Sequence, residues 1–263
     1  MKSHSKSLKV TLGEVPFLIN REESVNVRFS SRKQNLMVAD PNIVFSVDQI
    51  KFELKIAQKD YASAKAQATF LDEKFGYQCL RIDNKLLEDH QNTRNKGQQF
   101  WYGLDLQSLQ TPYSEIVEMI DHLKPQSGDL WLDLGAGYGR IGTVLGLLQP
   151  DVRFIGYEYV SLRVQEGNRI YKKWNIPSAE LIQVDLADDC FEIDEADLYF
   201  IYDFGSRKDI YKVLEKLRLI AQKRSIRVIG RGRGVKNWIL MDFPWLEPQA
   251  APEHFVNWTL FRS

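Results

Sequence analysis

The segment that most constrains this chain is a glycine-rich turn at residues 133–142, Asp-Leu-Gly-Ala-Gly-Tyr-Gly-Arg-Ile-Gly. It follows the apolar run 130–132, which predicts a short buried strand, and it leads into the apolar stretch 141–148, which predicts a helix. Glycine lets a ligand approach the backbone closely, and the N-terminus of a helix presents free N–H groups. A strand, a glycine turn and a helix in this order therefore predict a ligand-binding site.

One candidate ligand is a dinucleotide. Gly137, Gly139 and Gly142 satisfy the spacing G-x-G-x-x-G, in which the backbone approaches a pyrophosphate. Glu158 lies further along the chain and is an acidic residue of the kind that binds the ribose of a nicotinamide cofactor. These residues leave a nicotinamide-dependent oxidoreductase open as an alternative.

The second candidate ligand is S-adenosylmethionine. Its usual signature is an acidic residue that closes the strand, here Asp133, followed by alternating glycines, here Gly135, Gly137 and Gly139. A carboxylate at the strand end would repel the pyrophosphate of a dinucleotide, whereas it suits the cationic methionine end of S-adenosylmethionine. More than a hundred residues also precede the turn, whereas a dinucleotide-binding fold often begins at its first strand. We therefore favour S-adenosylmethionine as the cofactor.

The chain after the turn alternates between predicted strands and helices. Strands are predicted at residues 154–157, 179–184, 198–202, 226–229, 238–241 and 255–261, and helices at residues 160–174 and 208–222. The strand at residues 198–202, which is the fourth when the strand at 130–132 is counted first, is almost wholly apolar. This is expected for a central strand that is covered on both faces. This order, with its closing hairpin, predicts the α/β class: a doubly wound, mostly parallel seven-stranded sheet with an antiparallel C-terminal edge.

Acidic residues follow the second and third strands. Glu158 ends the second strand, and its carboxylate can accept hydrogen bonds from both hydroxyls of a ribose. Asp185 and Leu186 follow the third strand, where an acidic or amide group commonly meets the amino group of adenine; Asp188 is the alternative carboxylate. We expect Glu158, Asp185 and Leu186 to bind the nucleoside part of the cofactor.

From about Thr111 to the C-terminus, the sequence resembles the class I, seven-stranded S-adenosylmethionine-dependent methyltransferases. The resemblance is carried by residues 133–139, by Glu158 and by Asp185, and it covers roughly the last three-fifths of the chain. It implies S-adenosylmethionine as the cofactor and methyl transfer as the activity. It also implies that Thr111, in the segment before the turn, and Tyr138, within the turn, contribute to the cofactor site.

A second, shorter resemblance is to the non-SET protein-lysine methyltransferases. Thr111 and Pro112 are expected to cap a helix at residues 113–123, and the turn continues Gly139-Arg-Ile141, as in the small mitochondrial lysine methyltransferases. This resemblance implies a protein lysine as the methyl acceptor. Asp203-Phe-Gly205, after the fourth strand, departs from the Asn-Pro-Phe of the histone-lysine family.

Methyl transfer to a lysine requires a neutral amine, because the free side chain has a pKa near ~10.4. A narrow, desolvated channel lined by tyrosines would favour that neutral form, and Tyr113, Tyr138 and Tyr202 are positioned in the sequence to line one. Asp203, at the end of the fourth strand, is the preferred residue on the acceptor side. We therefore predict Asp203, Tyr113 and Tyr202 as catalytic residues. A small-molecule or RNA acceptor, or a cofactor-binding scaffold of the same fold, remains an alternative.

The residues before the turn have a different composition. Residues 10–29 suggest small strands or a loose hairpin, and Ser46-Val-Asp-Gln49 predicts the capped start of a long polar helix that runs through about Lys74 and stops at Gly76. Residues 83–99 suggest a linker or a surface helix. We expect residues 1–98 to form a smaller α+β accessory region and residues 99–263 to form the methyltransferase domain. The accessory region is either a solvated appendage or an element for substrate recognition or dimerisation.

Charge and composition set limits on partners. The formal net charge is zero, so we expect no global attraction to nucleic acid or to an anionic membrane. A basic cluster that includes Arg231 and Arg233, after the fifth strand, could clamp RNA phosphates or an acidic peptide. No apolar run approaches the roughly 20 residues of a membrane helix, and the four histidines show no metal-ligand spacing. With Cys79 and Cys190 far apart in the sequence, we expect a cytoplasmic protein with reduced thiols, no metal and no membrane contact.

Overall fold

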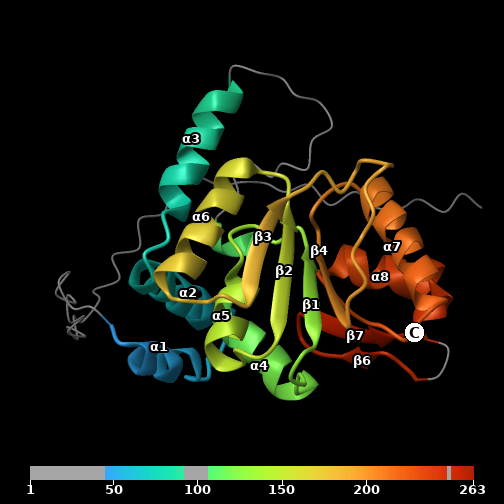
Figure 1. Cartoon of the computed structure of the whole chain (residues 1–263), viewed down its shortest axis with the longest axis horizontal. Coiled ribbons are helices and arrows are strands. Elements are labelled where there is room, and N and C mark those ends of the chain that lie inside the picture. The colour runs from blue at the N-terminus through green and yellow to red at the C-terminus, as the bar shows by residue number, and fades with distance from the viewer. Residues whose placement is uncertain (1–44, 92–105, 248–249) are drawn as a thin grey trace, which may run out of the picture. The chain divides into compact units, whose positions relative to one another are not determined.

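The computed structural model describes residues 45–91, 106–247 and 250–263, which form one sheet with helices on both faces (Figure 1). The strands are β1 (Leu130–Leu134), β2 (Arg153–Glu158), β3 (Ala179–Gln183), β4 (Leu198–Tyr202), β5 (Arg227–Arg231), β6 (Glu253–His254) and β7 (Trp258–Arg262). The helices are α1 (Val47–Leu54), α2 (Tyr61–Phe75), α3 (Cys79–Gln91), α4 (Tyr113–Leu123), α5 (Arg140–Leu148), α6 (Ser161–Lys173), α7 (Arg207–Ala221) and α8 (Arg233–Asp242). Two short 3-10 segments, η1 (Leu106–Ser108) and η2 (Pro244–Leu246), complete the described elements.

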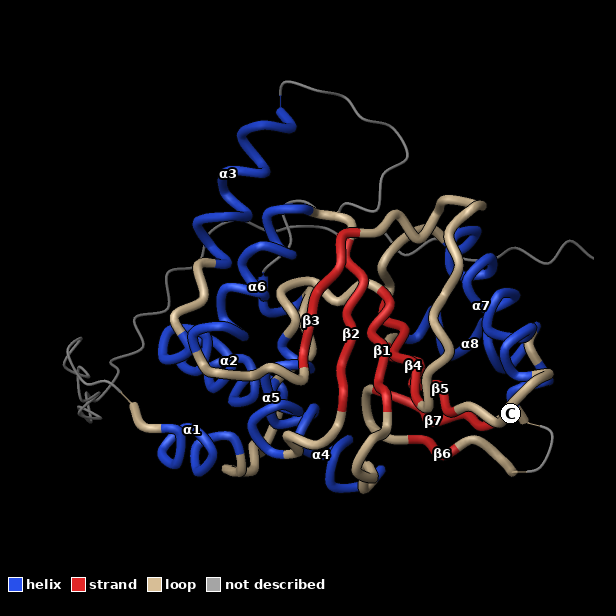
Figure 2. The backbone as a smooth tube through the Cα atoms, in the orientation of Figure 1, coloured by secondary structure: helices blue, strands red, loops and turns tan. Residues whose placement is uncertain are grey.

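The sheet has the strand order β3-β2-β1-β4-β5-β7-β6 (Figure 2). Strands β1 to β5 are parallel to one another, whereas β7 pairs antiparallel with both β5 and β6. This arrangement confirms the predicted fold class. The chain order reverses between β1 and β4, and ligands of doubly wound sheets bind at the carboxyl ends of the strands at such a reversal. The glycine turn after β1 therefore lies where the topology places a site.

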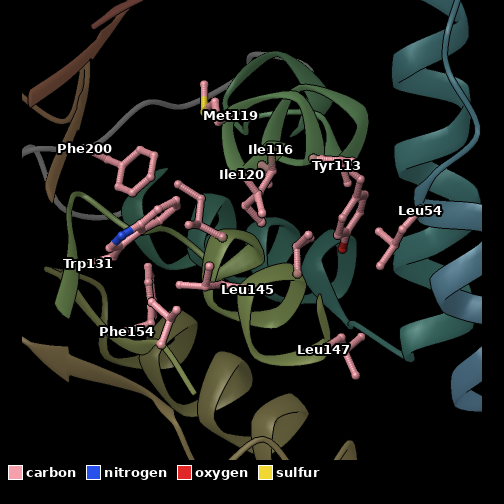
Figure 3. Close-up of a cluster of buried hydrophobic side chains, with 14 of the residues drawn as sticks. Leu54, Tyr113, Ile116, Met119, Ile120, Trp131, Leu145, Leu147, Phe154 and Phe200 are labelled. Atoms are coloured by element: carbon pink, nitrogen blue, oxygen red, sulfur yellow. The ribbon is translucent and has the colours of Figure 1, made fainter. Parts of the chain in front are cut away.

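The core has two layers, one on each face of the sheet. Leu198 and Phe200 of β4 belong to the cluster that includes residues of α4 and α5, whereas Tyr199 and Ile201 belong to the cluster that includes residues of α7 and α8. This alternation follows from the two-residue period of a strand. In the first cluster, the rings of Trp131 and Phe200 lie 5.5 Å apart and face the helical side chains across the layer (Figure 3).

The long polar helix that we expected from Ser46 to about Lys74 is two helices, α1 and α2. A second capping box starts α2: the Asp60 carboxylate accepts from the backbone N–H of Ser63 at 2.8 Å, and the backbone N–H of Asp60 donates to the Ser63 hydroxyl at 3.1 Å. The break lets both helices bury their apolar residues in the same cluster, as Leu54 and Leu71 do. Gly76 ends α2 with φ of 83°, as predicted.

The helices before residue 98 share their core with the sheet. The Phe75 ring lies 5.5 Å from that of Tyr113, and Ile50 is fully buried in the cluster that includes residues of α4 and α5. The proposed division of the chain at residue 98 stays a prediction, as do the predictions for residues 10–29 and 92–99, which lie outside the described residues. In the described ranges, no helix is both long and apolar enough to span a membrane.

The strand predicted at residues 238–241 is wrong, because these residues lie within α8. Val235 and Ile239 are four residues apart and are both fully buried, while Met241 is 75% exposed, which is the pattern of an amphipathic helix. A run of four apolar residues does not distinguish a strand from a helix by itself. The first strand of the closing hairpin is instead the two-residue β6.

Candidate functional site

The three glycines of the turn have positive φ values but different surroundings. Gly135 has φ of 97°, and a Cβ there would lie 2.3 Å from the Cβ of Phe204. Gly139 has φ of 75°, and a Cβ there would lie 2.2 Å from the Tyr171 hydroxyl. Gly137, with φ of 57°, would meet nothing within 4 Å. Two of the glycines are therefore required by packing, and the third leaves open space at the centre of the turn.

Glu158, at the end of β2, is tied to the glycine turn. Its Oε2 accepts from the backbone N–H of Gly137 at 2.8 Å, and its Oε1 accepts from that of Val160 at 2.9 Å. The Arg163 guanidinium approaches Oε1 to 4.0 Å. Burial raises the pKa of Glu158, and Arg163 and the two backbone N–H groups oppose that shift. The carboxylate thus stands beside the turn, at the place where the sequence predicts a ribose contact.

Asp133, near the end of β1, is a buried carboxyl group with a different environment. Burial, assisted by the nearby charge of Glu158, raises the pKa of Asp133 to about 8. No group in the described part of the chain donates a hydrogen bond to its side chain. Such a group is stabilised by a ligand that brings a cation or a hydrogen-bond donor.

Two adjoining cavities lie at the carboxyl ends of the central strands. The lining of the first cavity includes Thr111, Asp133, Arg140 and Arg231. The second cavity has a volume of about 200 Å³, and its lining includes Glu158, Tyr159, Arg163, Asp203 and Phe204. Both cavities border Leu109, Gly135, Gly137 and Tyr202. The shared lining places Asp133 and Glu158 in two adjoining cavities that both border the glycine turn.

Sequence reasoning missed a buried cluster around Arg140, the first residue of α5. Its guanidinium forms an ion pair with Asp72 of α2 and donates to Gln107 at 2.8 Å. The Tyr113 hydroxyl donates to the same Asp72 carboxylate at 2.8 Å, and Arg140 also donates to the backbone carbonyl of Thr111 at 3.4 Å. The cluster fastens α2 and the segment before α4 to the start of α5. Its only sequence signal is one charged residue in an otherwise apolar helix.

A second buried ion pair borders the first cavity from β5. Arg231 donates to Glu115 of α4 at 2.5 and 3.2 Å, and Asn257 donates to Glu115 at 3.1 Å. The Arg231 guanidinium also lies 4.2 Å from the centre of the Tyr202 ring. We expected both Arg231 and Arg233 to be available to RNA, but Arg231 is buried and neutralised by Glu115. Arg233 alone of the two is exposed.

Two of the three residues predicted as catalytic border the second cavity. Tyr202 ends β4 and donates its hydroxyl to the carbonyl of Ser108 at 2.9 Å. Asp203 follows it and is half-buried; burial raises the pKa of its carboxyl group, and Arg231 opposes the shift. The third, Tyr113, lies away from both cavities in the Asp72 cluster.

Of the other residues predicted to bind the cofactor, some line a cavity and others do not. Thr111 lines the first cavity as expected, whereas Tyr138 donates its hydroxyl to Asp83 of α3 at 2.7 Å and lines neither cavity. Asp185 is exposed and accepts from the backbone N–H of Ala187 at 2.9 Å, and Leu186 is buried in the core. The adenine contacts of Asp185 and Leu186 therefore stay predictions.

The cysteines and the acidic residues give two further observations. Cys79 is buried and Cys190 is exposed, and both are free thiols. Across the described ranges, no group of three or more His, Cys, Asp or Glu side chains is arranged to hold a metal ion. The chemical groups that border the two cavities are carboxylates, guanidinium groups, phenol rings and the glycine backbone.

The strand order, the antiparallel edge and the glycine turn after β1 agree with the fold that the resemblance in the sequence implies. The chain is similar to an RNA methyltransferase from Salinibacter ruber solved with S-adenosyl-L-homocysteine, with 20% identity over 58% of this chain and 91% of that one and a TM-score of 0.41. It is also similar to the C-terminal domain of precorrin-6Y C5,15-methyltransferase from Rhodobacter capsulatus, with 16% identity over 58% and 88% of the two chains and a TM-score of 0.43. No protein-family model and no curated protein matches the sequence. At this level of similarity, function has to be inferred from the chain's own residues.

Proposed function

We propose that the protein is an S-adenosylmethionine-dependent methyltransferase. The observation that carries this proposal is the buried Asp133 carboxyl group, which has no hydrogen-bond donor in the described chain and borders the space left open at Gly137. A cationic amine and sulfonium would stabilise its ionised form, whereas a pyrophosphate would be repelled by Asp133 and Glu158 together. The residues present therefore fit S-adenosylmethionine better than a dinucleotide.

The proposed cofactor site uses both cavities. Glu158 is the acceptor for the ribose hydroxyls, Asp133 faces the amino end of the methionine, and Thr111 closes the first cavity from the segment before α4. Gly135 and Gly139 hold the turn in the shape that keeps the space at Gly137 open. When bound, the cofactor supplies an electrophilic methyl group on a sulfonium. The protein contributes alignment of the acceptor and exclusion of water.

For the acceptor we propose an amine, with a protein lysine as the leading candidate. Asp203 supports this choice, because a carboxylate beside the cavity can accept a hydrogen bond from the amine and orient its lone pair. Burial raises the pKa of the Asp203 carboxyl group, which makes it a better acceptor for the proton that the ammonium has to lose before its lone pair attacks. The Tyr202 hydroxyl is held by the Ser108 carbonyl, which fixes one wall of the acceptor side.

The proposal is tested by incubating the protein with radiolabelled S-adenosylmethionine and a cell extract, and then fractionating the extract into protein, RNA and small molecules. We expect label in the protease-sensitive fraction. Label in the nuclease-sensitive or low-mass fraction would replace lysine with RNA or a small molecule as the acceptor. Binding of the cofactor without any label would favour the scaffold alternative over the enzyme.

The variant Asp203→Asn examines the acceptor side. An amide cannot accept the amine proton, so we expect methyl transfer to fall by about 100-fold, while binding of S-adenosylhomocysteine stays near normal. Asp151→Asn is the matched control, because Asp151 is exposed and precedes the amino-terminal end of β2. Equal transfer by the two variants would remove Asp203 from the mechanism.

A further inference from the structure

A groove adjoins the acceptor side of the site. It runs between the first turn of α8, the turn between β6 and β7, and Tyr61 at the start of α2. Tyr202 and Arg231 line both this groove and the first cavity. A molecule lying in the groove is therefore next to the first cavity of the proposed cofactor site.

The groove carries two cations that make no ion pair within the described ranges. Arg233 is exposed and Lys236 is partly exposed, and both line the groove from the first turn of α8. They differ from Arg231, whose charge is neutralised by Glu115. Residues three apart on a helix are neighbours on its surface, so the two side chains can act on one anion. The groove is thus positively charged beside the acceptor site.

The opposite wall of the groove is aromatic. Tyr61 is 44% exposed, and Phe255 stacks on Trp258 with the ring centres 3.7 Å apart. The indole N–H of Trp258 is buried and has no hydrogen-bond acceptor in the described chain. An aromatic wall suits a ligand that has apolar surface, such as a peptide.

The charge changes sign further along the surface. A second hollow shares Tyr61, Asn257, Trp258 and the 97% exposed Val256 with the groove. Its charged lining is one lysine, Lys59, and three acidic residues, Asp60, Glu115 and Glu118. A nucleic acid that extended from Arg233 into this hollow would bring its phosphates against these carboxylates. A peptide has a neutral backbone, and it can place an acidic side chain on the cations and other residues beyond.

We infer that this groove binds an acidic peptide segment of the methyl acceptor, with an Asp or Glu side chain on Arg233 and Lys236. The inference rests on the proposed amine methyltransferase activity. A Cβ on Gly232, directly before Arg233, would lie 2.9 Å from the Asp203 carboxylate, so the cations adjoin the acceptor position. Since an extended chain advances only ~3.3 Å per residue, the acidic residue stands close to the methylated lysine in the peptide sequence.

The test uses the full chain saturated with S-adenosylhomocysteine and two fluorescein-labelled nonapeptides. Both peptides carry one central lysine among alanines and serines. One has Glu two residues to each side of the lysine, and the other has Gln at these positions. We expect the Glu peptide to bind about tenfold more tightly by fluorescence anisotropy at low salt, with the difference shrinking as salt is added.

Charge-reversal variants locate the effect. Arg233→Glu and Lys236→Glu should each reduce or reverse the preference for the Glu peptide. Lys172→Glu should keep the preference, because Lys172 is exposed on α6, which does not line the groove. An equal loss in Lys172→Glu would show that net charge alone is measured, and that result would overturn the inference.

Two further outcomes separate this inference from the proposed function. If S-adenosylhomocysteine binds in calorimetry but the Glu and Gln peptides bind equally, the groove inference fails and the methyltransferase proposal stands. If S-adenosylhomocysteine does not bind, the proposed function fails. A labelled oligo(U) RNA that binds more tightly than the Glu peptide, and is weakened by Arg233→Glu, would make the groove a nucleic-acid site and overturn the peptide assignment.

Discussion

The proposed cofactor side and the proposed acceptor side of the site both contain buried charged groups. They differ in whether the protein supplies a close ion-pair partner. On the cofactor side, Asp133 and Glu158 are buried carboxyl groups with raised pKa values, and the nearest guanidinium lies 4.0 Å from Glu158. On the acceptor side, Glu115 is held directly by Arg231 and Asn257. A buried charge without a partner is costly, and it is kept where a ligand supplies the partner. A closed pair holds the protein scaffold together. The difference indicates which groups serve the ligand and which serve the fold.

The largest expected effect on the free energy of unfolding concerns the buried ion pair between Arg140 and Asp72. Arg140→Ala leaves the Asp72 carboxylate buried without its cation, so we expect the free energy of unfolding to fall by about 3–5 kcal/mol. Urea denaturation measures the change. Arg218→Ala breaks an exposed pair with Glu215 and should cost less than about 0.5 kcal/mol. A cost below about 1 kcal/mol for Arg140→Ala would contradict its role in the scaffold.

Asp133→Asn should weaken ligand binding without lowering the stability of the fold. Removing an unpartnered buried carboxyl group should leave stability unchanged or improve it at pH 8.5. The affinity for S-adenosylmethionine should fall by about 10- to 100-fold, because a charge-assisted hydrogen bond is lost. Calorimetry on the wild type and the variant measures the affinity. A variant that unfolds easily but binds normally when folded would reverse the assignment of Asp133 from ligand to scaffold.

The pH dependence of stability sharpens the same comparison. The pKa of Asp133 is about 8 in the folded protein and ordinarily 3.8, so the native state binds the extra proton between these values. Stability should therefore fall as pH rises from about 4 to about 8, by up to roughly 1.4 kcal/mol for each pH unit, and then level off. Denaturation across this range should show a shallower fall in Asp133→Asn. Identical curves would mean that Asp133 is solvated in the free protein.

The smallest expected effect distinguishes two glycines of the turn. Gly137→Ala puts a methyl group into open space at a φ of 57°, so stability should fall by only about 1 kcal/mol while the affinity for S-adenosylhomocysteine drops. Gly139→Ala brings its methyl group against the Tyr171 hydroxyl and should destabilise the fold more. Thermal melts and calorimetry on both variants provide the comparison. Equal melting temperatures with normal affinity in Gly137→Ala would contradict a ligand at that position.

The geometry of the glycine turn could be predicted from the sequence because it is built locally, while the cofactor contacts stay predictions. Parallel pairing of β1 with β2 sets Leu134 opposite Tyr157, and the Tyr157 carbonyl then accepts from the backbone N–H groups of Gly135 and Ala136 at 2.9 Å each. The relation of Asp133 to Glu158 follows from two strand ends and one turn. Periodicity and turn chemistry report directly on such features.

The buried ion pairs around the site could not be predicted in the same way, because they join distant segments. Arg231 lies 116 residues from Glu115, and Arg140 lies 68 residues from Asp72. No local pattern indicates such a partner, so Arg231 looked like part of a solvated basic cluster and Tyr113 looked like a channel residue. Packing also determines the secondary structure of residues 238–241, because a helix at this position buries Ile239 in the core.

The central claim is that an amino-acid-bearing nucleoside of the S-adenosylmethionine type, and not a dinucleotide, binds at the turn. Calorimetric titration of the wild type and of Glu158→Ala with S-adenosylhomocysteine and with NAD tests it most directly. We predict that the wild type binds S-adenosylhomocysteine and not NAD. The variant should bind S-adenosylhomocysteine about 100-fold more weakly, because it lacks the ribose contacts and the hydrogen bond from the Gly137 backbone N–H. Binding of NAD alone, or near-normal affinity of Glu158→Ala for S-adenosylhomocysteine, would contradict the account.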